Sequence, residues 1–179
     1  MDVITLFAVA ISLALDAFSV SIASGMQTKS VALKMATSFG AFQAIMPLIG
    51  WSAGIELLAL ISGVDHWAAF TILSIIGLKM IYEALKQEKP QKKPLNLYTL
   101  LLLSIATSID ALAAGLSFAF LKISILTAIT VIGTVTFALA FLGALFGNKL
   151  GNKFSNKVAI AGGLILIGIG TKIVIEHLA

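Results

Sequence analysis

The segment SLALDAFSVSIASG, residues 12–25, places the carboxylate of Asp16 in the middle of a hydrophobic stretch. A second segment, ATSIDALAAG at residues 106–115, does the same with Asp110. A carboxylate near the midplane of a bilayer costs roughly 2.5–3.5 kcal/mol on insertion scales, so such residues are rare and commonly functional. We therefore interpret the rest of the chain as a scaffold that brings the two aspartates together.

The composition indicates an integral membrane protein. Hydrophobic residues make up 59% of the 179 residues and charged residues only 11%, whereas a soluble domain carries roughly 25% charged residues. The apolar runs are long enough for spanning helices rather than barrel strands. The chain has no cysteine, which excludes disulfides and thiolate ligands. It also has no P-loop motif, so ATP-driven transport would need another subunit.

Six spanning helices are expected, because each crossing needs about 20 apolar residues. They cover approximately residues 4–24, 35–60, 66–85, 97–120, 123–147 and 158–178. The prediction is an all-α, polytopic membrane protein with a single domain, residues 1–179. Its halves, 1–85 and 97–179, are joined by the polar and basic linker KQEKPQKKPLN at 86–96.

The lysines predict the orientation of the chain. Nine of the twelve lysines follow the first, third and fifth expected spans, namely Lys29, Lys34, Lys86, Lys89, Lys92, Lys93, Lys149, Lys153 and Lys157. The opposite loops contain only Lys122. Because lysine-rich loops remain in the cytoplasm, the linker 86–96 is expected to be cytoplasmic and both termini are expected outside the cytoplasm. The same clustering explains the net charge of +4 without any binding of nucleic acid.

The two halves of the chain are related by an internal repeat. A shift of 93 residues places GLKMIYEAL (77–85) on GTKIVIEHL (170–178), and Asp16 aligns with Asp110 at a shift of 94. Each half has three expected spans, an odd number, so the second half must enter the membrane from the opposite face. This predicts two inverted three-helix repeats, and carriers built in this way bind substrate near the midplane between the repeats.

Helical spacing surrounds both aspartates with hydroxyl groups. The polar positions on or beside these two helix faces are Ser12, Asp16, Ser19, Thr107, Ser108 and Asp110. Oxygen-rich sites with two carboxylates suit hard divalent cations such as Mn²⁺ and Mg²⁺. Two like charges in a low dielectric do not both stay ionised without a counter-ion, so metal and protons would compete for one site. The alternative is that each aspartate is only a structural hydrogen-bonding partner between helices.

The second expected span carries FGAFQAIMPLIGW, residues 39–51. Pro47 removes a backbone donor, so it is expected to bend the helix or free a carbonyl group. Gln43 is a candidate metal ligand through its side-chain oxygen, with an interhelical hydrogen bond as the alternative. Met46 is a candidate soft ligand, with packing as the alternative. The repeat equivalent of Gln43 is Thr136, so the symmetry breaks here, as an asymmetric set of ligands requires.

Two lysines lie inside expected spans, Lys79 and Lys172, and each has a glutamate four residues later, Glu83 and Glu176. One interpretation is that each lysine reaches the interface and forms a local ion pair. The other is that one of these lysines neutralises an aspartate of the site when no metal is bound.

Several segments together resemble the bacterial manganese efflux pump family of the MntP type, within the lysine-exporter superfamily. They are SLALDAFSVSIASG, FGAFQAIMPLIGW, HWAAFTILSIIGLKMIYE, ATSIDALAAG and GGLILIGIGTK. The resemblance extends over all six expected spans. It implies an exporter of Mn²⁺ in the bacterial cytoplasmic (inner) membrane, with Mn²⁺ as transported substrate and no cofactor. It also implies that Asp16 and Asp110 are essential, with the Gln43 region beside them.

The leading hypothesis is a secondary transporter that exchanges cytoplasmic Mn²⁺ for protons at Asp16 and Asp110. A carrier of another divalent cation or of a cationic amino acid would use the same fold. A passive channel would conduct without coupling to protons. An intramembrane aspartyl protease also needs two aspartates, but the Gly-x-Gly-Asp motif is absent around Asp110. The oligomeric state and the coupling ion stay open.

Overall fold

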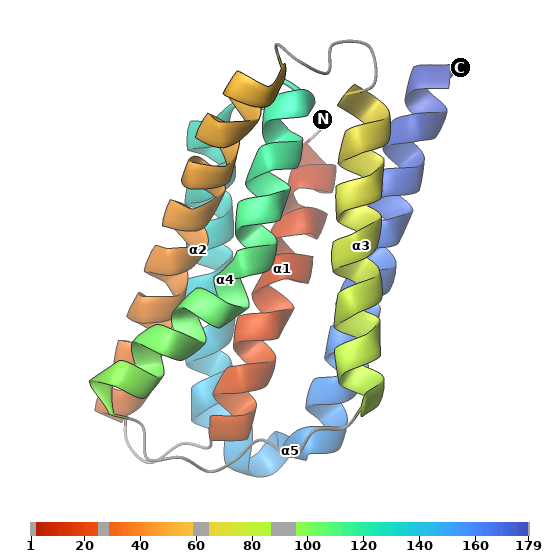
Figure 1. The fold of residues 1–179 in the computed structure, drawn as a ribbon. Coiled ribbons are helices and arrows are strands. Elements are labelled where there is room, and N and C mark those ends of the chain that lie inside the picture. Colours follow the sequence, from red (N-terminus) through yellow and green to blue (C-terminus); the bar gives the residue numbers. More distant parts are fainter. Residues whose placement is uncertain (1–2, 25–28, 59–64, 87–95, 179) are drawn as a thin grey trace.

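The computed structural model describes residues 3–24, 29–58, 65–86 and 96–178 of the chain. The regular structure of these residues is entirely α-helical. The helices are α1 (Val3–Ser24), α2 (Lys29–Leu58), α3 (Asp65–Lys86), α4 (Leu97–Phe120) and α5 (Ile125–Leu178). They form one bundle in which α1 lies inside, against α5, while α4 packs on α2 and α3 packs on α5 (Figure 1).

Helix α5 accounts for the last two crossings. It contains 54 residues, and a straight helix of that length would be about 80 Å long, far more than the roughly 30 Å of a hydrocarbon core. Figure 1 shows that α5 descends along the bundle, turns at its lower end and returns. Its apolar parts are 125–146 and 159–175. The two expected spans, 123–147 and 158–178, are therefore the two arms of α5, joined at the turn.

The fold confirms a multi-pass membrane protein. Five helical segments are long and apolar enough to cross a bilayer, and the shorter 159–175 completes six passes. The described ends of the chain lie at one end of the bundle, while α1 leads to α2 and α3 leads to α4 at the other end (Figure 1). Exposed Lys34, Lys86 and Lys157 belong to the elements of that second end, whereas Lys122 lies in the turn between α4 and α5. The linker residues 87–95 lie outside the described part.

Glycines allow the helices to approach backbone to backbone. A Cβ atom on Gly50 of α2 would collide with the carbonyl oxygen of Leu112 of α4. A Cβ atom on Gly143 of α5 would lie 2.9 Å from the carbonyl oxygen of Phe18 of α1. Gly143 aligns with Gly50 at the shift of 93, and Leu112 aligns with Phe18 at the shift of 94 that relates the two aspartates. The contact of α2 with α4 between the two halves therefore corresponds to the contact of α5 with α1.

Other contacts follow the same relation. Gly40 and Gly133 are equivalent in the repeat, and they face each other: a Cβ atom on Gly40 would lie 3.1 Å from the carbonyl oxygen of Gly133, and the reverse distance is 3.2 Å. Such reciprocal contacts are what a two-fold relation between the halves predicts. Gly77 aligns with Gly170 and Phe70 with Gly163 at the shift of 93. The contact of Gly77 with Gly163 therefore corresponds to the contact of Gly170 with Phe70.

The close approach of α2 and α4 makes Gly50 sensitive to substitution. We expect Gly50→Ala to lower stability by about 1–3 kcal/mol, because the added methyl group forces the two helices apart. Gly168→Ala is the matched control, since a Cβ atom there has nothing within 4 Å, and helix propensity favours alanine by up to about 1 kcal/mol. The measurement is the thermal unfolding midpoint of each purified variant in detergent. Equal midpoints for both variants would contradict the packing described.

Candidate functional site

A run of hydroxyl residues shapes α4 around Asp110. The hydroxyl group of Ser104 donates to the carbonyl oxygen of Leu100 at 2.9 Å, and that of Ser108 donates to the carbonyl oxygen of Ser104 at 2.6 Å. Thr107 donates to the same Ser104 carbonyl at 3.3 Å. Side chains that bond back to the preceding turn in this way often bend a helix. Helix α4 is bent in its first half (Figure 1), which directs its later turns toward α1 and α3.

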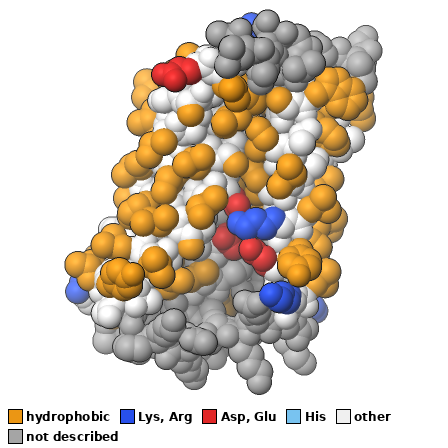
Figure 2. Space-filling view, viewed as in Figure 1, with side chains coloured by type: hydrophobic (Ala, Val, Ile, Leu, Met, Phe, Trp, Pro, Cys, Tyr) orange, Lys and Arg blue, Asp and Glu red, His pale blue; other side chains and the backbone are white. Residues whose placement is uncertain are grey.

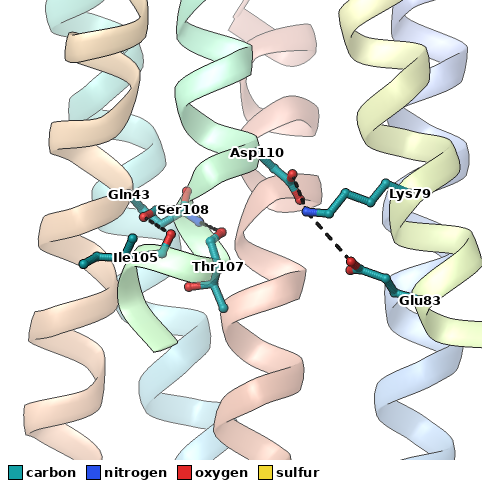
Figure 3. Close-up of polar contacts among 7 residues, drawn as sticks. All are labelled: Gln43, Lys79, Glu83, Ile105, Thr107, Ser108 and Asp110. Carbon is teal, nitrogen blue, oxygen red and sulfur yellow. Dashed lines mark hydrogen bonds and ion pairs between the residues drawn. The ribbon is translucent and has the colours of Figure 1, made fainter. Parts of the chain in front are cut away.

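Asp110 forms an ion pair with Lys79 of α3. The Lys79 ammonium group donates to Oδ1 of Asp110 at 2.8 Å, and it lies 4.0 Å from Oε1 of Glu83 (Figure 3). The Asp110 side chain is only 7% exposed, while those of Lys79 and Glu83 are 39% and 53% exposed. Oδ2 of Asp110 is buried and has no hydrogen-bond partner among the described residues. One oxygen of this carboxylate is therefore available to a further ligand.

Asp16 belongs to the same electrostatic cluster. It lies on α1, and the charges of Asp110, Glu83 and Lys79 all act on it. We call these four residues the charged cluster. Figure 2 shows acidic and basic side chains gathered at one place on a largely hydrophobic face of the bundle. Three helices, α1, α3 and α4, thus bring charges from distant parts of the sequence together inside the membrane-spanning region.

Gln43 of α2 lies on another side of α4. Its amide nitrogen donates to the carbonyl oxygen of Thr107 at 2.9 Å, whereas Asp110 faces Lys79 (Figure 3). The interhelical hydrogen bond considered from the sequence is therefore present. Oε1 of Gln43 is fully buried without a hydrogen-bond partner among the described residues. A buried acceptor of this kind is uncommon in proteins.

The neighbours of Gln43 in the motif have structural contacts. Met46 is partly buried and packs against the main hydrophobic core, as the packing alternative proposed. Pro47 is fully buried inside α2, which continues through it as one helix. It lies against Gly115 of α4, where a Cβ atom would collide with the Pro47 carbonyl oxygen. Thr136, the repeat equivalent of Gln43, is fully buried, and its hydroxyl group has no partner among the described residues.

The remaining predicted residues lie around α1. Ser12 is buried and donates to the carbonyl oxygen of Ala8 at 2.8 Å, and Ser19 is half-buried. Lys172 donates to the hydroxyl group of Thr5 at 3.2 Å. The predicted pairing of Lys172 with Glu176 falls on a side chain outside the described part of the structure. The sequence does not indicate that Thr5 accepts this hydrogen bond, because Lys172 is 167 positions away.

Sequence reasoning also missed a polar contact that joins α2 to α4. The hydroxyl groups of Ser38 and Ser104 are hydrogen-bonded at 2.7 Å. The sequence contains several serines and threonines in each of these helices, and no local pattern indicates which of them meet across α2 and α4. The contact holds α2 against α4 beside the turn where Ser104 accepts two hydroxyl groups.

The charged cluster offers a cation two acidic ligands, Asp16 and Asp110. Among residues 3–24, 29–58, 65–86 and 96–178, as far as their side chains are described, no three of histidine, aspartate and glutamate are arranged to hold a metal ion. A divalent cation at Asp16 and Asp110 would therefore take hydroxyl, carbonyl or water oxygens as its other ligands, which hard cations accept.

A separate groove of about 450 Å³ runs between α2 and α5. It is lined by small, apolar and hydroxyl residues, namely Thr37, Gly40, Ala41, Ala44, Ile129, Thr130, Gly133, Thr134 and Phe137. None of these side chains is charged, so this groove offers a cation no compensation for the loss of its hydration shell. The charged cluster is the better candidate for a cation site.

Comparison with known proteins identifies relatives over the whole chain. A family model described as "Putative manganese efflux pump" matches residues 25–174. A protein named "Putative manganese efflux pump MntP" from Gloeothece citriformis is 53% identical, with 99% of this chain and 97% of the relative covered. Proteins of the same name from Clostridium botulinum and Methanosarcina acetivorans are 47% and 49% identical, again over 99% of this chain and over 96% and 98% of the relatives. No solved structure matches the fold.

The ion pair between Lys79 and Asp110 should couple the two residues energetically. We expect Asp110→Asn and Lys79→Met each to destabilise the protein, and the double variant to lose less than the sum, with a coupling energy of about 1–3 kcal/mol. Each single change leaves one charge without its partner, whereas the double change removes both. The measurement is thermal unfolding of all four proteins in detergent. Lys34→Met combined with Asp110→Asn is the control, and effects that simply add for Lys79 as well would contradict the pairing.

Proposed function

This chain belongs to the family of manganese efflux pumps, and on that premise we propose that it is a secondary carrier that exports Mn²⁺ from the cytoplasm. Membership of the family makes it a transporter rather than an enzyme. Mn²⁺ is its transported substrate and the lipid bilayer its surroundings. The proposal places it in the cytoplasmic membrane, with the lysine-rich end of the bundle in the cytoplasm and both termini on the opposite side.

The observation that carries the proposal is the charged cluster inside the bundle. Asp16 and Asp110 come from α1 and α4 and act on each other electrostatically. Ionisable residues within spanning helices mark ion pathways in many membrane proteins, because their burial is too unfavourable to persist without a role. Two carboxylates match the charge of one divalent cation. We propose Asp16 and Asp110 as the acidic ligands of Mn²⁺, with Ser12, Thr107 and Ser108 as neighbouring hydroxyl groups.

Exchange with protons follows from the chemistry of the same carboxylates. A carboxylate that binds a metal must lose its proton, so metal and protons compete for it. In the proposed cycle, cytoplasmic Mn²⁺ displaces protons from Asp16 and Asp110. The site then opens to the other side, and protons from outside displace the metal. The proton gradient of the cell would drive export in this way without nucleotide hydrolysis.

Alternating access requires two halves that move against each other. We propose that residues 1–85 and 97–179 form two inverted three-helix repeats, as the repeated sequence indicates. The reciprocal contact of Gly40 with Gly133 supports a two-fold relation between the halves. Carriers with inverted repeats expose a central site to either side by rocking one repeat or bundle against the other. Glycine contacts allow such sliding, since they contain no interlocking side chains.

A cationic amino acid is the second candidate substrate, and one observation favours it. Asp110 already binds the alkylammonium group of Lys79 at 2.8 Å, so the carboxylate accepts the group that a lysine substrate would present. Competition separates the two candidates. Excess free lysine should leave Mn²⁺ flux unchanged if the substrate is the metal, and should inhibit it if the site carries amino acids.

The two aspartates provide the direct test of the proposed site. In inside-out vesicles, we expect Asp16→Asn and Asp110→Asn each to lower Mn²⁺ uptake by at least about tenfold, a loss that even the outer partners of metal ligands produce. Collapse of the pH gradient should slow the wild type as well. Glu56→Gln is the control, because Glu56 is exposed on α2. If both aspartate variants insert normally and transport at the wild-type rate, the proposed mechanism is wrong.

We propose that the buried Oε1 of Gln43, which in this structure lies on another side of α4 from Asp110, reaches the metal during the transport cycle. We expect Gln43→Leu to raise the Mn²⁺ concentration for half-maximal transport by about tenfold, as loss of a group around a metal commonly does. Met46→Leu, one turn along α2, is the control that disturbs only packing. If Gln43→Leu lowers the thermal unfolding midpoint and leaves the half-saturating concentration unchanged, then Gln43 only supports α4 through the Thr107 carbonyl group.

A further inference from the structure

The charged cluster contains a cation of its own. Two acidic side chains, Asp110 and Glu83, share one ammonium group, that of Lys79, and the charge of Lys79 also acts on Asp16. Lys79 lies between Asp110 and Glu83, at 2.8 Å from the former and 4.0 Å from the latter. It is covalently tethered to α3, so it acts on Asp110 at a high effective concentration whatever the solution contains. Any cation that binds Oδ1 of Asp110 must first displace it.

We propose that Lys79 is a resident counter-ion of Asp110 that Mn²⁺ displaces during transport, and that Glu83 receives the ammonium group when it leaves. This inference rests on the proposed function, because it concerns the same site. It adds a positioning residue, Lys79, and a receiving residue, Glu83, to a site whose metal ligands are Asp16 and Asp110.

The geometry allows this transfer without movement of any helix. Lys79 and Glu83 lie one turn apart on α3, and the two carboxylates lie on either side of the ammonium group (Figure 3). A lysine side chain is a flexible four-carbon stem with a compact charge at its end. Rotation about its bonds suffices to exchange one carboxylate for the other. Glu83 is about half exposed and Asp110 is buried, so displacement moves the ammonium group outward.

A tethered ammonium group favours divalent over monovalent cations. The attraction between an ion and a carboxylate is proportional to the charge of the ion. A sodium or potassium ion therefore offers Asp110 no more charge than Lys79 does, and it must also leave water and give up its freedom in solution. A divalent ion interacts with both Asp16 and Asp110 and offers twice the charge. On this basis Lys79 excludes monovalent cations and weakens the binding of divalent ones.

The return of Lys79 also assists release. When the metal leaves, the ammonium group compensates Asp110 at once, so the carboxylate is not left as an isolated charge at membrane depth. Lys172, the repeat equivalent of Lys79, donates to the hydroxyl group of Thr5 at 3.2 Å.

The test is the concentration dependence of Mn²⁺ transport by the full-length chain in proteoliposomes. We expect Lys79→Met to lower the half-saturating Mn²⁺ concentration by at least about threefold and to lower the maximal rate, since it strengthens binding of the metal more than it stabilises the transition state. Glu83→Gln should raise the half-saturating concentration, because the displaced ammonium group has lost its second partner.

A second measurement tests selectivity. Replacing choline with K⁺ in the assay buffer should inhibit Mn²⁺ transport by Lys79→Met but not by the wild type. Lys34→Met, an exposed lysine on α2, should match the wild type in all three measurements.

The outcomes separate this inference from the proposed function. If Asp110→Asn abolishes transport while Lys79→Met and Glu83→Gln keep the wild-type half-saturating concentration, the proposed function stands and the role of Lys79 is overturned. A Lys79→Met protein with a reduced rate and a raised half-saturating concentration also overturns it, because that is what a purely structural loss produces. If Lys79→Met does not insert, Glu83→Gln decides alone. Wild-type transport by Asp110→Asn would overturn both proposals.

Discussion

A charge inside a bilayer requires a partner, and the arrangement of α1, α3 and α4 meets that requirement. Asp110 is buried, and the ammonium group of Lys79 lies 2.8 Å from it. Water cannot compensate such a carboxylate at membrane depth, so the compensating charge must come from the protein. The ion pair therefore constrains α3 to lie beside α4 at this level. It also brings Glu83 to the same place, and Asp16 completes the charged cluster from α1.

The packing of the bundle makes this arrangement possible. Lipid chains are as apolar as leucine, so helices in a membrane associate through close contact and interhelical hydrogen bonds rather than through the hydrophobic effect. Here Gly50 lies against the backbone of α4, and Gly115 lies against the Pro47 carbonyl group. Hydrogen bonds between Ser38 and Ser104 and between Gln43 and Thr107 add to these contacts. Helix α4 is thus held by α2 on one side, which leaves Asp110 directed toward α3.

The same features connect the fold to transport. Helices joined by glycine contacts can slide with little change in side-chain packing. The ion pair of Lys79, in turn, can form with either of two carboxylates. Lys79 has a second carboxylate, Glu83, at 4.0 Å. A carrier must change which side its site faces without leaving charge uncompensated in the membrane. The proposed exchange of the Lys79 ammonium group between Asp110 and Glu83 is one physical answer to that problem.

The alternation of apolar spans and lysine-rich loops was sufficient to predict a six-pass helical membrane protein, since hydrophobicity and length are local properties of the chain. The scarcity of charge singled out Asp16, Asp110 and Lys79 for the same reason. Tertiary structure alone decided which of these residues meet: Lys79 contacts Asp110, whereas Lys172, at the equivalent position, contacts Thr5. It also decided that α5 packs against α1, α2 and α3. Pairing between distant residues depends on the positions of whole helices, which no local pattern encodes.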